Sequence, residues 1–220
     1  MVTICHASDW HGHWYELPPA DLYIFTGDML PNFPHLTRNF RIKEYNEINR
    51  QTTWIRDLAN AEPGGLRRFL GNPDAPVALV RGNHDFIDIG RFFGGEYFEV
   101  TPYAGECKEF CGLRIGGFRG IPPIGGYWSD EITQVERAAR IRDMPGDLDV
   151  IICHPPPKGI LACIWGCVEL RTKVDLWEMF DNGPKLICFG HIHEEGGKVI
   201  ERENIIYSNA SLKHNIIELD

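Results

Sequence analysis

Five short apolar runs divide this chain, and each is followed closely by side chains that can bind metal ions. The runs are residues 2–5, 22–25, 77–80, 150–153 and 186–189. Their length and their content of β-branched and aromatic residues are typical of buried strands rather than of helices. In open α/β sheets, the residues just beyond the carboxyl ends of neighbouring strands share one crevice. The runs therefore predict an α/β fold in which residues far apart in sequence meet at one site.

The residues that follow these runs offer carboxylate, imidazole and amide groups. In chain order they are Asp9, His11, Asp28, Asn83, His84, Asp85, His154, His191 and His193. Most of these signals are weak alone, because Gly-Asp is a common turn and a lone histidine is more often structural. The set as a whole predicts a metal site.

Spacing within the set adds detail. Asp9 and His11 are separated by one residue, as are His191 and His193, so each pair lies on one side of an extended segment. Asp28 carries two carboxylate oxygens and is suited to bridge two ions roughly 3.5–4 Å apart. The second histidine pair suits either two neighbouring metal ions or one metal ion and a substrate contact.

The segment Gly82-Asn83-His84-Asp85 is the most specific of these motifs. Its glycine permits a sharp turn, Asn83 offers a neutral oxygen ligand, and His84 can stay off the metal and act as an acid. Asp85 either orients His84 or caps the turn, and turn statistics favour the cap.

Composition limits the class of protein. With 220 residues, 43% of them hydrophobic, and no linker-like stretch, residues 1–220 are expected to form a single domain. We find no apolar run of membrane-spanning length and no signal peptide, which predicts a cytoplasmic protein without a membrane segment. Seven cysteines, several of them inside the apolar runs, argue against a disulfide framework.

Two cysteine pairs offer an alternative metal site. Cys107 and Cys111, like Cys163 and Cys167, are spaced so that four thiolates could bind zinc. The spacing is wider than in the usual zinc knuckle, so the pairs are expected to pack instead.

The charge balance bears on the partner. The chain has 31 acidic and 22 basic residues, a net charge of −9, which argues against extended nucleic acid as a partner. Two divalent cations would nevertheless make the predicted site locally positive, so a small phosphate ester can bind there.

The remaining sequence predicts three helices and a second sheet. An amphipathic helix is expected at about 40–61, stopped by Pro63-Gly64-Gly65, with an apolar face made of Ile42, Tyr45, Ile48, Ile55 and Leu58. Further helices are expected from 130 or 131 to 142 and at about 168–180. Residues 97–118 and 198–219 are typical of short strands and hairpins, which indicates a second, mixed sheet packed on the first.

In this order, the five blocks from Asp9 to His193 resemble the calcineurin-like metallophosphoesterase superfamily. The resemblance implies a four-layer α/β/β/α sandwich of two mixed sheets flanked by helices, with two divalent metal ions at one end of the sheets. It implies that one ion is held by Asp9, His11 and His193, the other by Asn83, His154 and His191, and that Asp28 bridges both. His84 would be the histidine that binds neither ion.

Segments 154–159, 166–170, 190–194 and 209–211 resemble a narrower branch, the metallophosphoesterase-domain-containing proteins, which are related to class III cyclic-nucleotide phosphodiesterases. This implies hydrolysis of small phosphodiesters, including cyclic or linear nucleotides. The hypothesis is in-line attack by a metal-bridging hydroxide, with His84 protonating the leaving group. The protein phosphatase branch fits less well, because Met29-Leu30-Pro31-Asn32 follows Gly27-Asp28 where that branch has an acidic-arginine-glycine turn.

Alternatives remain. The same site would serve a phosphomonoesterase, a protein phosphatase or a nuclease, and a non-catalytic scaffold is disfavoured because it has no need of a full ligand set. The mixed donors suit Mn²⁺, which we favour, and also Fe, Zn or Ni. No particular oligomeric state is predicted.

Several further residues have two interpretations. Near the first motif, three aromatic residues either stack on a base or cover the core: Trp10, Trp14 and Tyr15. Three cations either contact phosphate or lie at the surface: Arg38, Arg81 and Lys158. Two polar residues either assist the site or lie in loops: His13 and Asn209.

Overall fold

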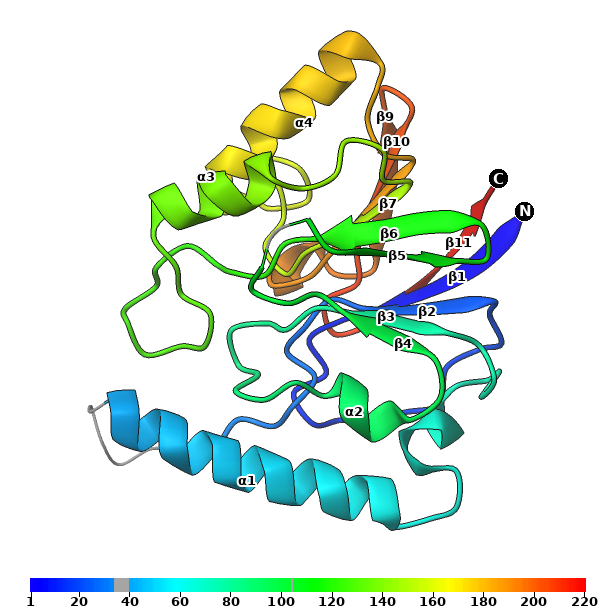
Figure 1. Ribbon diagram of the computed structural model, residues 1–220, viewed down its shortest axis with the longest axis vertical. Helices are drawn as coiled ribbons and strands as arrows, with labels where there is room; N and C mark the ends of the chain where they lie inside the picture. The colour runs from blue at the N-terminus through cyan, green and yellow to red at the C-terminus, as the bar shows by residue number, and fades with distance from the viewer. Residues whose placement is uncertain (34–39, 104) are drawn as a thin grey trace.

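Two β-sheets stack face to face in the computed structural model, which describes residues 1–33, 40–103 and 105–220 (Figure 1). The first sheet comprises β11 (His214–Leu219), β1 (Val2–Ala7), β2 (Leu22–Phe25), β3 (Val77–Leu79) and β4 (Tyr97–Glu99), in that order. β1 to β4 are parallel, and β11 runs antiparallel to β1. All five predicted runs form strands, to within a residue or two at their ends.

The second sheet comprises β5 (Cys107–Phe110), β6 (Leu113–Gly117), β7 (Val150–Ile152), β8 (Leu186–Phe189), β10 (Ile205–Asn209) and β9 (Lys198–Arg202), in that order. Its central strands are parallel, while β5 and β9 pair antiparallel at its edges. Both sheets are therefore mixed, as predicted.

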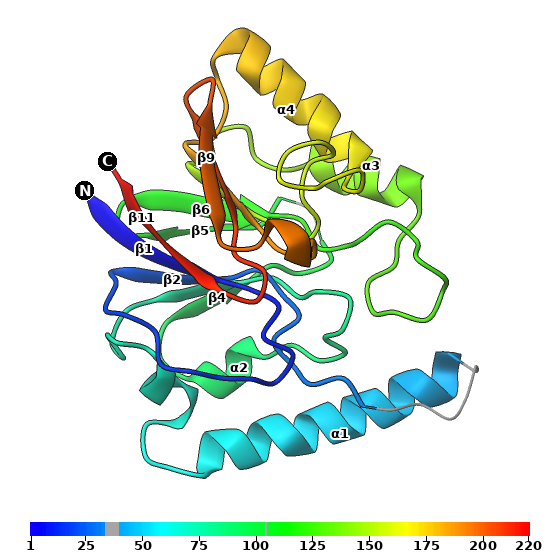
Figure 2. The ribbon, with the colours of Figure 1, turned by 180° about the vertical axis from the view of Figure 1, so that it is seen from behind.

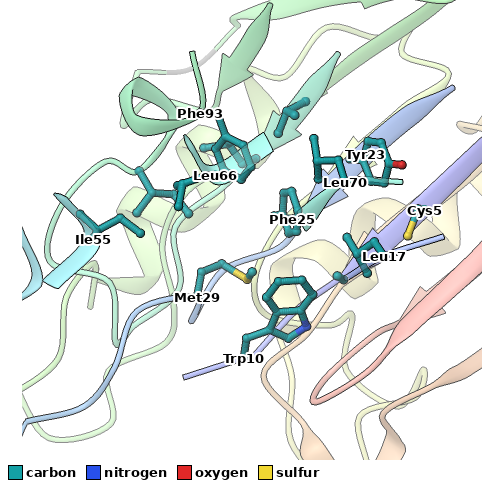
Figure 3. Close-up of a cluster of buried hydrophobic side chains, with 14 of the residues drawn as sticks. Cys5, Trp10, Leu17, Tyr23, Phe25, Met29, Ile55, Leu66, Leu70 and Phe93 are labelled. Atoms are coloured by element: carbon teal, nitrogen blue, oxygen red, sulfur yellow. The ribbon is translucent and has the colours of Figure 1, made fainter. Parts of the chain in front are cut away.

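Alternation of apolar side chains along the strands builds three cores. In β2, Leu22 and Ile24 belong to the cluster between the two sheets, whereas Tyr23 and Phe25 belong to the cluster on the outer face of the first sheet. Figure 3 shows that outer cluster, to which Ile55 also contributes. A third cluster covers the outer face of the second sheet. Strands buried on both faces explain why the runs are continuously apolar.

Helices cover both outer faces. α1 (Phe40–Asn60), the short α2 (Gly90–Phe93) and the 3₁₀ helix η1 (Gly65–Phe69) lie on the side of the first sheet (Figures 1 and 2). α3 (Gln134–Arg142) and α4 (Val168–Phe180) lie on the second; another 3₁₀ turn, η2 (His193–Glu195), follows β8. The predicted four-layer sandwich, two mixed sheets flanked by helices, is confirmed.

Two details of the helices differ from expectation. α3 begins later than predicted because Thr133 and Glu136 form a capping box at its start. In α1, the apolar residues Ile42, Tyr45 and Ile48 are exposed to solvent. The buried row in that half of the helix is polar instead, made of Lys43, Glu47 and Gln51. This half of α1 faces loops with polar backbone groups rather than an apolar core.

The cysteines take no part in any disulfide. All seven are free. Cys107 and Cys167 pack as predicted, but Cys111 and Cys163 are exposed, and the groups of metal-binding side chains found among the described residues contain no cysteine. None of the helices described is both long and apolar enough to cross a membrane.

Candidate metal centre

Loops at the carboxyl ends of five parallel strands bring the predicted residues to one edge of the sandwich. Asp9 and His11 follow β1, Asp28 follows β2, and Asn83 to Asp85 follow β3. The second sheet supplies His154 after β7 and the pair His191 and His193 after β8. The site therefore lies beyond the carboxyl ends of strands from both sheets, which is where open α/β sheets bind ligands.

Donor atoms from these loops form three groups, and within each group they lie within 4.8 Å of one another. The groups are Asp9 with His11 and His193, His11 with Asp28 and His84, and Asp28 with His154 and His191. Because Asp28 belongs to two of the groups, its carboxylate lies between the residues of the two predicted ions.

We call Asp28, Asn83, His154 and His191 the inner half of the centre. His154 Nε2 lies 3.2 Å from Asp28 Oδ2 and 3.1 Å from Asn83 Oδ1. His191 Nδ1 lies 3.2 Å from the same His154 nitrogen. On the opposite side of its ring, His154 Nδ1 donates to the carbonyl of Thr26 at 2.6 Å. That hydrogen bond fixes the tautomer and turns Nε2 towards the centre.

We call Asp9, His11 and His193 the outer half. His193 Nε2 lies 3.1 Å from Asp9 Oδ1 and 3.5 Å from His11 Nε2. The other oxygen of Asp9 accepts three hydrogen bonds, from Ser8 Oγ at 2.7 Å, from the His191 amide at 2.9 Å and from Ser211 Oγ at 3.0 Å. Asp9 Oδ1 is therefore the oxygen left facing the two imidazoles.

The backbone is held in an unusual conformation at these residues. Asp9, His11, Asp28 and His191 all have positive φ, at 57°, 47°, 55° and 70°. For a residue other than glycine this left-handed region costs about 1–3 kcal/mol, and it is found mainly where the surrounding structure imposes it. The loops therefore carry strain that positions their side chains.

Two glycines let the loops touch. A Cβ on Gly82 would collide with the backbone and carboxylate of Asp28, and a Cβ on Gly190 would collide with Ser8 and with Asp9 Oδ2. The glycine in each motif therefore allows close approach between loops from different strands.

His84 lies beside Asp28 and is partly buried. Its amide donates to Asp28 Oδ1 at 2.7 Å, and its Nε2 lies 3.9 Å from Asp28 Oδ2. The ring packs on Trp128, with centroids 4.3 Å apart, and its Nδ1 contacts Asn32 Oδ1. Burial lowers the pKa of His84, against the opposing effect of Asp28.

The Asp85 carboxylate is buried and bonded to backbone amides. It accepts hydrogen bonds from the amides of Asp28 at 2.7 Å, Leu30 at 3.0 Å and Gly82 at 3.1 Å. Burial, with repulsion from Asp28, raises the pKa of Asp85 to about 7. These contacts match the turn-capping interpretation and also join the Asp28 loop to the Asn83 loop.

Burial and neighbouring charges shift the pKa values of the side chains in the centre. Burial favours neutral His154, but the Asp28 carboxylate outweighs it and raises the pKa of His154 to about 10. Burial also favours neutral Asp28, yet the charge of His154 holds the pKa of Asp28 well below its usual range. Burial, together with the charge of His154, lowers the pKa of His191 to about 4. Because metal ions bind neutral imidazole, an ion here competes with the His154 proton.

Two polar residues outside the motifs hold the loops. Gln51 donates to the carbonyl of His84 at 2.6 Å and accepts from the amide of Phe86 at 2.8 Å. Asn209 donates to the carbonyl of Ile192, between the two metal-site histidines, at 3.1 Å. Asn209 is among the candidates predicted from the sequence, whereas Gln51 is not. The missed signal is the polar row in α1 with a spacing of four residues.

The other candidates separate into core, ion pairs and surface. Trp10 is 2% exposed and packs in the outer core of the first sheet, with Trp14 and Tyr15 against it, so these aromatics cover the core. Arg81 is paired with Asp88 and Asp130 rather than directed to the donors. His13 and Lys158 are exposed, and Arg38 lies outside the described residues.

The donor set fits divalent ions. Carboxylate oxygens, an amide oxygen and imidazole nitrogens suit borderline metals such as Mn, Fe, Zn and Ni, which tolerate mixed oxygen and nitrogen ligands. The donors come from both sheets and are already gathered, so little rearrangement is needed to bind.

The chain is similar to known proteins. The calcineurin-like phosphoesterase family matches residues 2–195. The chain is 27% identical to the Emericella nidulans protein named probable rhamnogalacturonate lyase C, over 91% of this chain and 18% of that protein. It is 25% identical to human metallophosphoesterase domain-containing protein 1, over 90% of this chain and 61% of that one. The chain therefore spans less than two thirds of either relative.

A solved structure shows the same fold. A crystal structure from Staphylococcus aureus, of a protein provisionally named a 5′-nucleotidase, in complex with alpha-ketoglutarate, superposes with a TM-score of 0.50 at 12% identity. The match covers 99% of this chain and 51% of that chain. Both the family match and the fold agree with the resemblance seen in the sequence. The chain belongs to the calcineurin-like phosphoesterase family.

Proposed function

We propose that this protein is a metal-dependent phosphoesterase that hydrolyses small phosphodiesters, with cyclic or linear nucleotides among the candidate substrates. The observation that carries the proposal is the position of Asp28, whose carboxylate is shared by donor groups on both of its sides. Two divalent ions bound there, Mn²⁺ being our choice, would supply an activated water and the positive charge that phosphate hydrolysis requires.

The protein's own residues then divide the remaining tasks. Asp9, His11 and His193 would hold one ion, Asn83, His154 and His191 the other, and Asp28 both. His84, held by Asn32 and Trp128, would donate a proton to the departing oxygen. Asp85 would act as a positioning residue, because its carboxylate bonds the backbone of two of the loops.

The charges favour a diester over a monoester. A phosphomonoester dianion needs more positive charge than a diester monoanion, and Arg81, the nearest candidate in the motifs, is already neutralised by Asp88 and Asp130. The net charge of −9 also disfavours extended nucleic acid. We propose a cytoplasmic location on the ground that the seven cysteines are free thiols.

A substrate panel tests the proposal. Bis-p-nitrophenyl phosphate, p-nitrophenyl phosphate, cyclic nucleotides and single-stranded DNA are assayed with Mn²⁺, using the wild type and Asp28→Ala. Asp143→Ala, at an exposed carboxylate beyond α3, is the matched control. We expect the diester to be the best substrate, and Asp28→Ala to lower kcat/KM by about 10³-fold or more, since both ions lose their shared ligand.

Other outcomes would point to other functions. Faster hydrolysis of the monoester indicates a phosphomonoesterase, and faster hydrolysis of DNA indicates a nuclease. No metal-dependent hydrolysis of any ester indicates the non-catalytic scaffold.

The role of His84 needs its own test. His84→Ala should lower turnover by about 10²–10⁴-fold for a diester with an alkoxide leaving group, which requires a proton. The loss should be much smaller with p-nitrophenolate, which departs without one. Equal losses with both leaving groups would rule out the proton-donor role.

A further inference from the structure

A pocket of about 710 Å³ lies beside the inner half of the centre. Three segments line it: the loop that precedes α3, the loop between β7 and α4, and the metal-site loop after β8. His191 is part of its wall. A molecule bound at the centre through phosphate oxygens can therefore extend an attached group into this pocket.

The pocket wall displays large apolar side chains to solvent. Ile164 is 77% exposed, Trp165 is 66% exposed and Ile124 is 52% exposed, and all three line this one pocket. Large apolar side chains gathered at a concave surface are a signature of ligand binding. Lys158 and Glu194 also line it and carry opposite charges, so the pocket as a whole favours neither sign.

Hydrogen bonds fix the walls in place. Asn209 donates to the carbonyl of Leu161, in the loop of Trp165, as well as to that of Ile192 in the metal-site loop. One buried side chain thus ties the pocket wall to the ligands. Within the wall, the Trp165 amide donates to the Ala162 carbonyl at 2.8 Å.

The opposite wall is fixed by Glu131. Its carboxylate accepts hydrogen bonds from five consecutive amides, those of residues 124–128. This includes the amide of Ile124, which lines the pocket. The pocket is therefore pre-formed, and binding there requires little ordering of the protein.

The position of the pocket indicates which part of a diester it receives. Among the described lining residues, His191 is the one that belongs to the donor groups, and it is in the inner half. His84, the proposed proton donor to the leaving group, contacts Asn32 and Trp128, which do not line the pocket. Among the described residues, the wall of this pocket therefore includes His191 but not His84.

We propose that this pocket binds a flat apolar group, such as an aromatic ring, attached to phosphorus through the ester bond that is not cleaved. Trp165 supplies the face on which the ring stacks. This inference rests on the proposed phosphodiesterase function and names its substrate class: diesters whose retained arm is aromatic.

Two diesters with the same leaving group test the proposal. p-Nitrophenyl phenyl phosphate and p-nitrophenyl ethyl phosphate both release p-nitrophenolate, so they differ in the retained arm alone. We expect Trp165→Ala to lower the phenyl-to-ethyl ratio of kcat/KM by about tenfold, and Trp165→Phe to preserve most of it. Phe180→Ala, at an exposed aromatic residue of α4, is the matched control and should leave the ratio unchanged.

A binding measurement gives a readout that does not depend on turnover. Calorimetric titration should show phenylphosphonate binding about tenfold more tightly than methylphosphonate, with the difference lost in Trp165→Ala. An unchanged ratio and an unchanged difference in Trp165→Ala would overturn the pocket assignment while leaving the phosphodiesterase function standing. If the wild type hydrolyses neither diester, the proposed function fails, and the titration alone decides whether the pocket binds aromatic groups.

Discussion

The inner and outer halves of the centre use the same kinds of ligand but differ in their access to water. His154 is fully buried and Asn83 is 3% exposed, whereas the side chain of His193 is 42% exposed. In the outer half, Asp9 alone is buried, and its two imidazole partners reach it from the surface. From this difference we expect burial, more than ligand type, to determine how firmly each half would hold an ion.

The contrast has a clear structural origin. His154 is anchored from below by the Thr26 carbonyl, so it is fixed by both sheets. His193 begins a 3₁₀ turn beyond the end of β8, where the chain is already at the surface. An ion in the inner half would be held by side chains that are mostly buried, whereas an ion in the outer half would be held by two imidazoles that are partly or largely exposed.

The largest expected effect comes from removing one histidine from each half. His154→Ala should remove the ion of the inner half and lower kcat/KM by about 10²-fold or more, with no recovery in millimolar Mn²⁺. His193→Ala should lose its ion on dialysis but recover activity as Mn²⁺ is added. Metal content by elemental analysis and rates across a Mn²⁺ titration measure both. Equal recovery of the two variants would end the distinction between the halves.

Ser211→Ala should weaken the outer half by a smaller amount. It removes one of the three hydrogen bonds to Asp9 Oδ2, so the apparent affinity for the more weakly held ion should fall by about tenfold. The measurement is the Mn²⁺ concentration at half-maximal activity. Ser129→Ala, at a buried serine that contacts Arg81, is the control and should leave this concentration unchanged. A matching rise of this concentration in the control would assign the effect to a general loosening of the structure.

Gln51→Leu changes a residue that holds the His84 loop, and we expect it to affect the binding of neither ion. It leaves the Phe86 amide without its partner, which should lower the free energy of unfolding by about 1–3 kcal/mol. It also frees the carbonyl of His84, so turnover should fall several-fold for alkoxide leaving groups while both ions stay bound. Urea denaturation, metal analysis and kinetics separate these effects. Loss of an ion would show that Gln51 supports the ligands rather than His84.

The smallest effect concerns His6, which lies between the sheets and bonds Thr26 and Ser208 through its two ring nitrogens. Burial lowers the pKa of His6 from its ordinary 6.5 to about 3. The unfolded chain therefore binds a proton at His6 more readily than the folded protein does. The contribution of neutral His6 to the free energy of unfolding is complete above pH 6.5 and declines as the pH falls towards 3.

Between pH 7.5 and 5.5, the metal-free wild type should lose about 1.4 kcal/mol more stability than His6→Gln, in which this proton is absent. Urea denaturation at the two pH values measures the difference. A parallel loss in both proteins would show that His6 does not titrate on unfolding.

The sequence predicted the strands, and the polar residues that gather beyond their ends, for a definite reason. Strands buried on both faces, such as 22–25 and 186–189, are continuously apolar, and the polar residue after each run marks where the strand leaves the core. The first half of α1 was predicted less well. Periodicity predicts that Ile42 and Tyr45 face inward. The structure buries Lys43 and Gln51 instead, because this half of the helix lies against polar loops.

The pocket residues carried no usable signal. Trp165 lies in a loop without periodicity, and nothing in the sequence shows that this loop lies beside His191. The aromatic residues near the first motif, Trp10 above all, belong to the core of the first sheet. Proximity between loops of different strands depends on sheet order, which local sequence does not encode.

The sequence by itself determined the chemistry of this protein: which side chains can bind ions, and that they follow strands. This is possible because ligand type and apolar periodicity are local properties. The tertiary structure alone decided that one half of the centre is mostly buried while the other is more open, and that Trp165 lines a pocket beside His191. These properties depend on how the two sheets pack on each other, because a side chain becomes buried only when the sheets have packed.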